Sequence, residues 1–279
     1  IAFIDTGICK NNDFDSRIKC FYDVVNHKNY VYDDCGHGTH VAGICSGSGA
    51  NSNGKYRGIA PESNIVMIKA LDFEGKGTAS DVLTGIQWIA DNCKKYNIRI
   101  LNMSIGAGIT NTKDPLVRAA EILWDMGIVV VAAAGNNGPQ KGTISSPGIS
   151  KKIITVGSAD DINVPENDIG KSYSGRGPTK ECVIKPDVVA PGTNIISCLC
   201  EDNKSNNYYK SLSGTSMSTP IVSGAIALLL EKAPDLKPDD IKFMLKQSCH
   251  NLECSPNRQG WGLLDIENLL NREVVYVRK

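Results

Sequence analysis

The sequence predicts an α/β fold with a mainly parallel central sheet and helices on both faces. Apolar segments of strand type alternate along the chain with segments of helical periodicity, which is typical of such a sheet. One strand-like run, 128–134, is apolar and β-branched in the way of a buried parallel strand. With 279 residues, 41% of them hydrophobic, the chain can bury one substantial core. We therefore expect one domain over residues 1–279.

The predicted elements follow one another in a regular order. A strand over residues 1–4 is followed by a helix of small residues that begins at His37. Strands are then expected over 65–68, 98–103, 128–134 and 153–156, with helices over 80–95 and 115–126. The run 221–230 is aliphatic or small on nearly every side, so a buried helix is expected there. Loops are expected over 47–56, 161–171 and 201–209.

The charge balance and the hydropathy give no reason to expect nucleic acid or a membrane as partner. The chain has 30 acidic and 30 basic residues, so nothing in its net charge favours nucleic acid or an anionic membrane. No apolar stretch reaches 18 residues without a charge, and a membrane span is therefore not expected.

Ser216 is a candidate nucleophile. It lies in the run 214–220, GTSMSTP, directly ahead of the predicted buried helix. The start of a helix offers free N–H groups and a positive dipole end, and both favour an oxyanion beside the serine. A serine at this place is most often an ordinary N-cap, so it needs support from elsewhere in the chain. Ser218 is the nearby hydroxyl that could be mistaken for the nucleophile, and we assign it to helix packing.

Two further motifs supply that support. Asp5 ends the first predicted strand and is followed by Gly7, and His37 stands between two glycines at the start of a helix. A serine becomes a good nucleophile when a histidine takes its proton and a carboxylate orients the histidine. Asp5, His37 and Ser216 can fill these three roles. His40 is the rival histidine, but it lies one turn further into the helix and is interpreted as an internally bonded structural residue.

The motifs resemble those of the subtilase (subtilisin-like, S8-type) family of serine proteases. The order Asp, His, Ser is that of subtilisin. Further matching blocks occur in family order: IDTG at 4–7, GHGTH at 36–40, GIAP at 58–61, NMSIG at 102–106, AAAGNNG at 132–138, SGRG at 174–177, KPDVVAPG at 185–192, GTSMSTP at 214–220 and GWG at 260–262. The resemblance implies a three-layer subtilisin-like fold and an endopeptidase that forms an acyl-enzyme on Ser216. The alternative is a catalytically silent pseudoprotease that serves as a binding or chaperone module.

The resemblance also assigns an oxyanion donor. Asn136 follows a predicted buried strand in the turn Gly135-Asn136-Asn137-Gly138, where an asparagine is ordinarily a turn residue. In the family this side chain donates to the oxyanion together with the backbone N–H of the serine, here Ser216. Asn137 is the rival, and the alignment of Ala-Ala-Gly-Asn favours Asn136.

Substrate residues follow from the same resemblance. An extended peptide is expected to add as a strand beside two backbone edges. These edges are Gly75-Lys76-Gly77 and Ser104-Ile105-Gly106. The pocket for the P1 side chain is expected between Ser104-Ile105-Gly106 and Ala133-Ala134-Gly135, with Ser145 near its base. None of these pocket residues is charged, which predicts an uncharged P1 side chain.

Cofactors and neighbouring segments are less clearly specified. The chemistry requires no cofactor. The resemblance makes a structural calcium possible, but its ligands stay unassigned. Asp23 is a candidate ligand, and the loop 47–56 has no clear calcium-binding pattern. Family members have residues ahead of the strand that begins here at Ile1, so we expect this chain to be a catalytic core without them. A pro-segment or inhibitor upstream is a candidate partner. The family favours an exported or cell-surface protein, whereas the cysteine content suits an intracellular one as well.

The chain has ten cysteines and two short N-glycosylation sequons. An even number of cysteines permits disulfides, but the chain is too long to depend on them, and no paired zinc spacing occurs. Cys45 and Cys93 are expected to be small buried hydrophobes, and Cys35 a free thiol near the cleft. Asn102-Met103-Ser104 and Asn203-Lys204-Ser205 match the N-glycosylation sequon, although the first lies in the predicted active-site strand.

Overall fold

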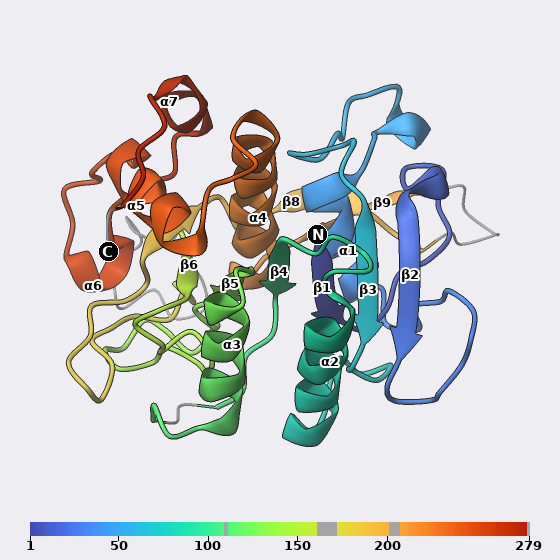
Figure 1. The fold of residues 1–279 in the computed structure, drawn as a ribbon, viewed down its shortest axis with the longest axis horizontal. Helices are drawn as coiled ribbons and strands as arrows, with labels where there is room; N and C mark the ends of the chain where they lie inside the picture. Colours follow the sequence, from blue (N-terminus) through green and yellow to red (C-terminus); the bar gives the residue numbers. More distant parts are fainter. Residues whose placement is uncertain (109–110, 161–171, 201–206, 278–279) are drawn as a thin grey trace.

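The structure is a computed structural model, and it describes residues 1–108, 111–160, 172–200 and 207–277. Within these residues a seven-stranded parallel sheet has the order β2-β3-β1-β4-β5-β6-β7 (Figure 1). The strands are β1 (Ala2–Asp5), β2 (Ile18–Asp23), β3 (Ile65–Lys69), β4 (Ile100–Met103), β5 (Val129–Ala133), β6 (Ile154–Ser158) and β7 (Val188–Ala190). The predicted α/β class with a mainly parallel sheet is confirmed.

Helices cover both faces of the sheet, and the alternation of side chains along β1 shows which helix covers which face. Phe3 packs with residues of α1 (His37–Ser46), whereas Ala2 and Ile4 belong to the cluster that includes residues of α2 (Ala79–Asn92). Helix α3 (Pro115–Asp125) lies beside α2, and α4 (Thr215–Lys232) packs against α1. The result is a three-layer arrangement.

Smaller elements surround these layers. Strands β8 (Ile195–Cys198) and β9 (Tyr209–Leu212) form an antiparallel hairpin against α1. Two 3-10 turns, Asp15–Arg17 and Ala50–Ser52, lie near the edge strand β2. The C-terminal helices are α5 (Pro238–Ser248), α6 (Pro256–Gln259) and α7 (Ile266–Asn271).

Most of the predicted elements are present with shifts of a few residues at their ends. The strands expected over 65–68, 98–103, 128–134 and 153–156 correspond to β3, β4, β5 and β6, and the helix expected over 221–230 begins earlier, at Thr215. Strands β2 and β7, the hairpin and α5 to α7 were not predicted. Strand β2 is an edge strand with partly exposed residues, and β7 has three residues, so neither gives a clear apolar run.

The predicted loops have three different outcomes. The loop 47–56 contains a 3-10 turn over Ala50–Ser52. The loop 161–171 lies outside the described residues, and of 201–209 the described part leads into β9 at Tyr209.

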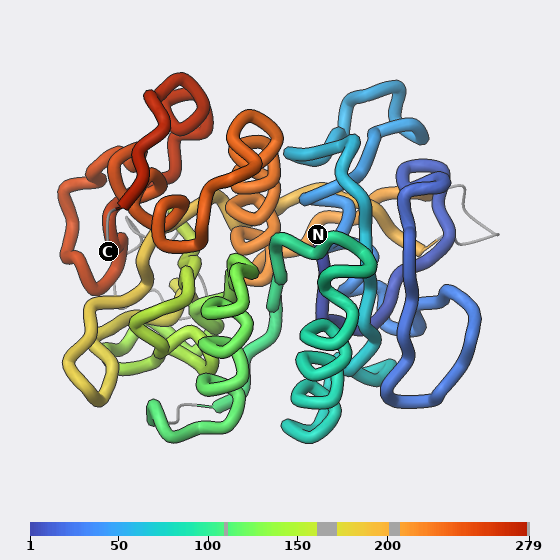
Figure 2. Tube along the Cα trace, in the orientation of Figure 1, coloured from blue at the N-terminus to red at the C-terminus, as the bar shows by residue number. Residues whose placement is uncertain are grey.

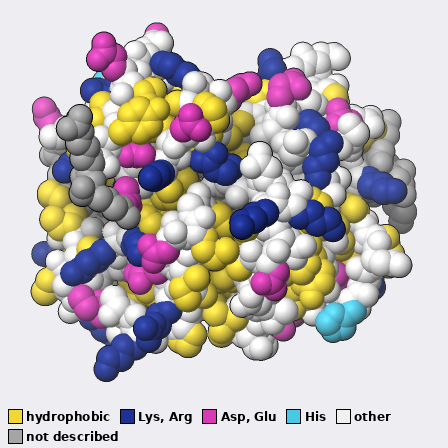
Figure 3. Space-filling model, in the orientation of Figure 1, with side chains coloured by type: hydrophobic (Ala, Val, Ile, Leu, Met, Phe, Trp, Pro, Cys, Tyr) yellow, Lys and Arg dark blue, Asp and Glu magenta, His cyan; other side chains and the backbone are white. Residues whose placement is uncertain are grey.

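The position of β1 in the sheet places Asp5, the first candidate residue, in the interior of the protein. Because β1 lies between β3 and β4, the chain begins inside the sheet and Asp5 ends an inner strand (Figure 2). The last described residue, Val277, donates its N–H to Asp240 Oδ1 of α5 at 2.6 Å. On the face drawn in Figure 3, basic and acidic side chains are interspersed, in keeping with a net charge of zero. In the described part of the chain, the helices are too short or too polar to span a bilayer.

Candidate active site

Asp5 and His37 meet at the carboxyl edge of the sheet, where β1 ends and α1 begins. His37 Nδ1 lies 2.7 Å from Asp5 Oδ1, and the Asp5 carboxylate is fully buried. The same oxygen accepts a 2.7 Å hydrogen bond from the Thr6 N–H. Glycine is required at position 38, because a Cβ there would collide with the carbonyl oxygen of Gly7. The glycine that follows the histidine thus lets α1 approach the strand that carries the carboxylate.

The pKa of His37 is raised above its ordinary value. Burial favours the neutral imidazole, but the charge of Asp5 and the hydrogen bond to it favour the imidazolium more strongly, and Asp33 acts in the same direction. An imidazole held in this way can accept a proton at Nε2 while the carboxylate stabilises the charge that results.

Asp33 holds the two segments together, and the sequence analysis did not identify it. Its Oδ1 accepts hydrogen bonds from Thr6 Oγ1 at 2.8 Å and from the Gly36 N–H at 2.8 Å. Its Oδ2 accepts from the N–H and the Oγ1 of Thr39, at 2.9 and 2.6 Å. Asp33 therefore links the end of β1 to the first turn of α1, and only its position just ahead of the histidine motif could have suggested this.

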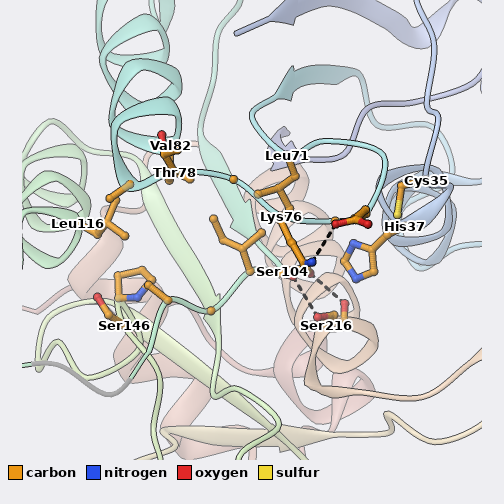
Figure 4. Close-up of a pocket in the computed structure, with 18 residues that line it drawn as sticks. Cys35, His37, Leu71, Lys76, Thr78, Val82, Ser104, Leu116, Ser146 and Ser216 are labelled. Carbon is orange, nitrogen blue, oxygen red and sulfur yellow. Dashed lines mark hydrogen bonds and ion pairs between the residues drawn. The ribbon is translucent and has the colours of Figure 1, made fainter. Parts of the chain in front are cut away.

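Ser216 lies in the first turn of α4 and lines the same cleft as His37 (Figure 4). Its side chain is half-buried, and its Oγ donates a 3.0 Å hydrogen bond to the carbonyl oxygen of Ser104. The hydrogen bonds of the described residues include none between Ser216 and His37. A rotation of the serine side chain would have to precede proton transfer to the histidine.

Asn136, and not Asn137, contacts the segment that carries Ser216. Asn136 Oδ1 accepts hydrogen bonds from the N–H and the Oγ1 of Thr215, both at 3.0 Å. With the amide oxygen held in this way, the Nδ2 group lies beside Gly214, on the serine segment. Asn137 Nδ2 instead donates to Ser145 Oγ at 3.2 Å.

The cleft has a volume of about 550 Å³ and contains both predicted substrate edges. Its lining includes the predicted residues Gly75, Lys76, Gly77, Ser104, Ile105 and Gly106. It also includes Cys35, which was expected near the cleft, and residues that were not predicted: Leu71, Glu74, Thr78, Ala79, Val82, Ala107, Leu116, Ser146 and Pro147. His37 and Ser216 stand at one end of the cleft, and Val82 and Leu116 at the other (Figure 4).

The second predicted wall of the P1 pocket lies behind this cleft. Ala133, Ala134, Gly135 and Ser145 are buried and are not among its lining residues. Ser145 packs directly on Gly135, and a Cβ on Gly106 would lie 3.0 Å from Ser145 Cβ. Ser145 is thus adjacent to both predicted walls.

His40 and Ser218, the alternatives to His37 and Ser216, have hydrogen-bond partners inside the protein. His40 is 1% exposed, and its Nε2 lies 3.1 Å from the carbonyl oxygen of Ile195 and 2.9 Å from that of Lys210. Burial lowers the pKa of His40 to about 4. Ser218 is fully buried and donates a 3.0 Å hydrogen bond to the carbonyl oxygen of Ala190. The structural roles expected for His40 and Ser218 are confirmed by these contacts.

Asp23 does not fit a calcium ligand. Its carboxylate accepts hydrogen bonds from the N–H groups of Val25 and Asn26, at 3.0 and 2.9 Å, and from Tyr32 Oη at 2.7 Å. These donors occupy the oxygens that a hard cation would need. Among the described residues, no group of three or more His, Cys, Asp or Glu side chains could hold a metal ion.

The cysteines differ in part from expectation. Cys9 and Cys200 form a disulfide across a sequence separation of 191 residues, which no local spacing could reveal. Cys35 is a free, exposed thiol that lines the cleft, as predicted. Cys45 is buried, as expected, whereas Cys93 is only partly buried, because it stands just beyond the last residue of α2, where one side is open to solvent.

The chain is similar in sequence to known serine proteases. A model of the family described as "Subtilase family" matches residues 1–262. Serine protease AprX of Bacillus subtilis (strain 168) is 44% identical, with 96% of this chain and 65% of AprX aligned. Subtilisin DY of Bacillus licheniformis is 35% identical, with 96% of this chain and 89% of that protein aligned.

Solved structures show the same fold. A cold-adapted subtilisin-like serine proteinase has a TM-score of 0.74 and 32% identity, covering 95% of this chain and 85% of its own. Sphericase has a TM-score of 0.79 and 27% identity, covering 94% of this chain and 90% of its own.

Proposed function

This chain belongs to the subtilase family, and on that premise we propose that it is a serine endopeptidase whose nucleophile is Ser216. The observation that carries the proposal is the 2.7 Å contact between His37 Nδ1 and Asp5 Oδ1 in a cleft that Ser216 also lines. A carboxylate, a histidine and a serine at one edge of a sheet are the groups that peptide hydrolysis by acyl transfer requires.

In the proposed reaction an extended peptide lies between the edges 75–77 and 104–106. The Ser216 hydroxyl turns from the Ser104 carbonyl to His37 Nε2 and gives up its proton as Oγ attacks the scissile carbonyl carbon. Asp5 holds His37 in the tautomer with a proton on Nδ1 and stabilises the imidazolium. His37 then donates that proton to the leaving amine, and the acyl-enzyme remains on Ser216. Water, deprotonated by His37, releases the acid in the second half of the reaction.

The negative oxygen of each tetrahedral intermediate needs donors, and we assign Asn136 Nδ2 and the Ser216 N–H to this role. Thr215 supports the assignment, because its two hydrogen bonds to Asn136 Oδ1 fix the amide beside the serine segment. Asn136→Ala is expected to lower kcat by roughly 10² to 10³, the size measured in a subtilisin on loss of such a donor.

A fluorophosphonate probe followed by mass spectrometry tests the proposal. We expect the label on Ser216 in the native protein and in Ser218→Ala, and its loss in His37→Ala. A folded protein that takes no label would favour the catalytically silent alternative, and a label on Ser218 would show that the wrong serine was chosen.

The substrate preference rests on the walls around Gly106 and Gly135. Because Ser145 packs between these glycines and no charged side chain lies among the predicted wall residues, a cationic P1 side chain would be buried without a partner. Cleavage of a peptide library is expected after uncharged P1 residues. Dominant cleavage after Lys or Arg would contradict this preference.

A further inference from the structure

The carbonyl group of Ser216 has lost its helical partner. In an α-helix this carbonyl accepts the N–H of the residue four positions later, which here is Pro220, inside α4. Proline has no N–H, so the helix cannot satisfy the carbonyl of its own candidate nucleophile.

A hydroxyl from another element takes the place of the missing N–H. Ser104 Oγ donates to the Ser216 carbonyl oxygen at 2.9 Å, and Ser104 is 3% exposed. The contact is reciprocal, because Ser216 Oγ donates to the Ser104 carbonyl oxygen at 3.0 Å. Figure 4 shows both bonds between the two serines as dashed lines. The loop that follows β4 thus holds the backbone of the nucleophile from outside the helix.

The Ser104 hydroxyl is itself oriented by a buried amide. Asn102 is fully buried on β4, and its Nδ2 donates to Ser104 Oγ at 3.0 Å. Its Oδ1 accepts a 2.9 Å hydrogen bond from the fully buried Ser223 Oγ, which also lies 3.2 Å from the Thr219 carbonyl oxygen. The sequon at Asn102 therefore has its amide enclosed in the core, with both amide atoms engaged.

The Ser216 carbonyl oxygen fixes the direction of the hydrogen bonds that lead to it. A carbonyl oxygen can only accept, so the Ser104 proton must point to Ser216. Ser104 Oγ must then accept from Asn102, which places Nδ2 toward Ser104 and Oδ1 toward Ser223. The single Ser223 proton has two acceptors within reach, Asn102 Oδ1 at 2.9 Å and the Thr219 carbonyl oxygen at 3.2 Å. The shorter contact continues the series Ser223, Asn102, Ser104, and aligned bonds of this kind polarise one another.

We propose that Asn102 is a positioning residue for the Ser216 nucleophile, acting through Ser104, and that Ser223 orients Asn102. The proposal rests on the proposed function of Ser216. Ser104 holds the carbonyl group of Ser216, and the N–H assigned to the oxyanion belongs to the same residue. Small displacements of such groups lower turnover more than they lower substrate affinity.

Steady-state kinetics on a chromogenic peptide with an uncharged P1 residue tests the proposal, with active sites counted by fluorophosphonate titration. We expect Ser223→Ala to lower kcat roughly 3-fold and Asn102→Leu roughly 10-fold, the effects of one neutral hydrogen bond and of its loss next to the nucleophile. KM should change less than about 2-fold in both variants.

Two controls separate positioning from general damage to the core. Ser218→Ala removes a buried hydroxyl from the same helix whose partner, the Ala190 carbonyl, is outside the series, so kcat should stay at the native value. In the double variant, Ser223→Ala should add almost nothing to Asn102→Leu, because the series is already broken.

The proposal is overturned if native kcat survives Asn102→Leu, if the Ser223→Ala loss is equally large in the Asn102→Leu background, or if Ser218→Ala lowers kcat as much. If Asn102→Leu fails to fold, the kcat of Ser223→Ala compared with that of Ser218→Ala still tests the proposal. An unlabelled and inactive native protein would refute the proposed function itself, which is a separate outcome.

Discussion

Helix α1 carries two histidines three residues apart, and they face opposite environments. His37, at the cleft, lies against the Asp5 carboxylate, and the pKa of its imidazole is raised. His40, one turn further, faces the backbone carbonyls of the hairpin strands β8 and β9, and the pKa of its imidazole is lowered to about 4.

The difference shows that the partner, and not the helix or the residue type, decides the chemistry. A carboxylate opposite Nδ1 stabilises the imidazolium, so His37 can take up a proton during a reaction. The two carbonyls opposite His40 fix a proton on Nε2, while its buried Nδ1 has no hydrogen-bond partner among the described residues. A second proton on His40 would therefore be buried without an acceptor.

The largest expected effect separates the two histidines by activity. His37→Ala should lower kcat on the order of 10⁶, the size measured in a subtilisin on loss of its triad histidine. His40→Gln should retain kcat per folded molecule, because its partners belong to the hairpin. Kinetics normalised to the folded fraction, measured by circular dichroism, check both expectations. A comparable loss of kcat in the two variants would contradict the assignment of different roles to His37 and His40.

The second effect is on stability in acid, and it belongs to His40. Its folded pKa of about 4 lies below the ordinary value near 6.5, so the unfolded state binds more protons between these values. Stability should therefore fall as the pH falls through this window, by about 3 kcal/mol for this group.

Urea unfolding at pH 7 and pH 4.5 measures this loss, and Ser216→Ala provides a background without self-digestion. His40→Gln in that background should show a smaller loss between the two pH values. An equal loss with and without His40 would assign the acid sensitivity to other groups.

The smallest effect is the pH at which activity declines. Because His37 must be neutral to take the serine proton and its pKa is raised, the acidic midpoint of kcat/KM should lie above the ordinary histidine value of about 6.5. The rate of fluorophosphonate labelling against pH gives the same midpoint without a substrate. A midpoint at or below 6.5 would mean that Asp5 does not dominate the environment of His37.

The sequence predicts the residues that line the cleft better than the residues that hold them in place. Asp5, His37 and Ser216 each stand in a short run with recognisable neighbours. Asp5 ends an apolar strand, His37 begins a helix of small residues, and Ser216 lies in the first turn of a buried helix. Pro220 is equally visible, but the hydroxyl that compensates for it comes from 112 residues earlier in the chain. Asp33 could be read as an ordinary loop residue, since its acceptor role exists only once Thr6 and Thr39 are brought together.

The disulfide between Cys9 and Cys200 has a topological consequence for an enzyme that digests proteins. It closes a covalent loop that contains His37, while Asp5 and Ser216 lie on the two chain arms outside it. A single cut anywhere from residue 10 to residue 199 opens this loop but separates nothing, because the two pieces stay joined through the sulfurs. Under oxidising conditions, one accidental nick in this region would leave the three candidate residues within one covalent molecule.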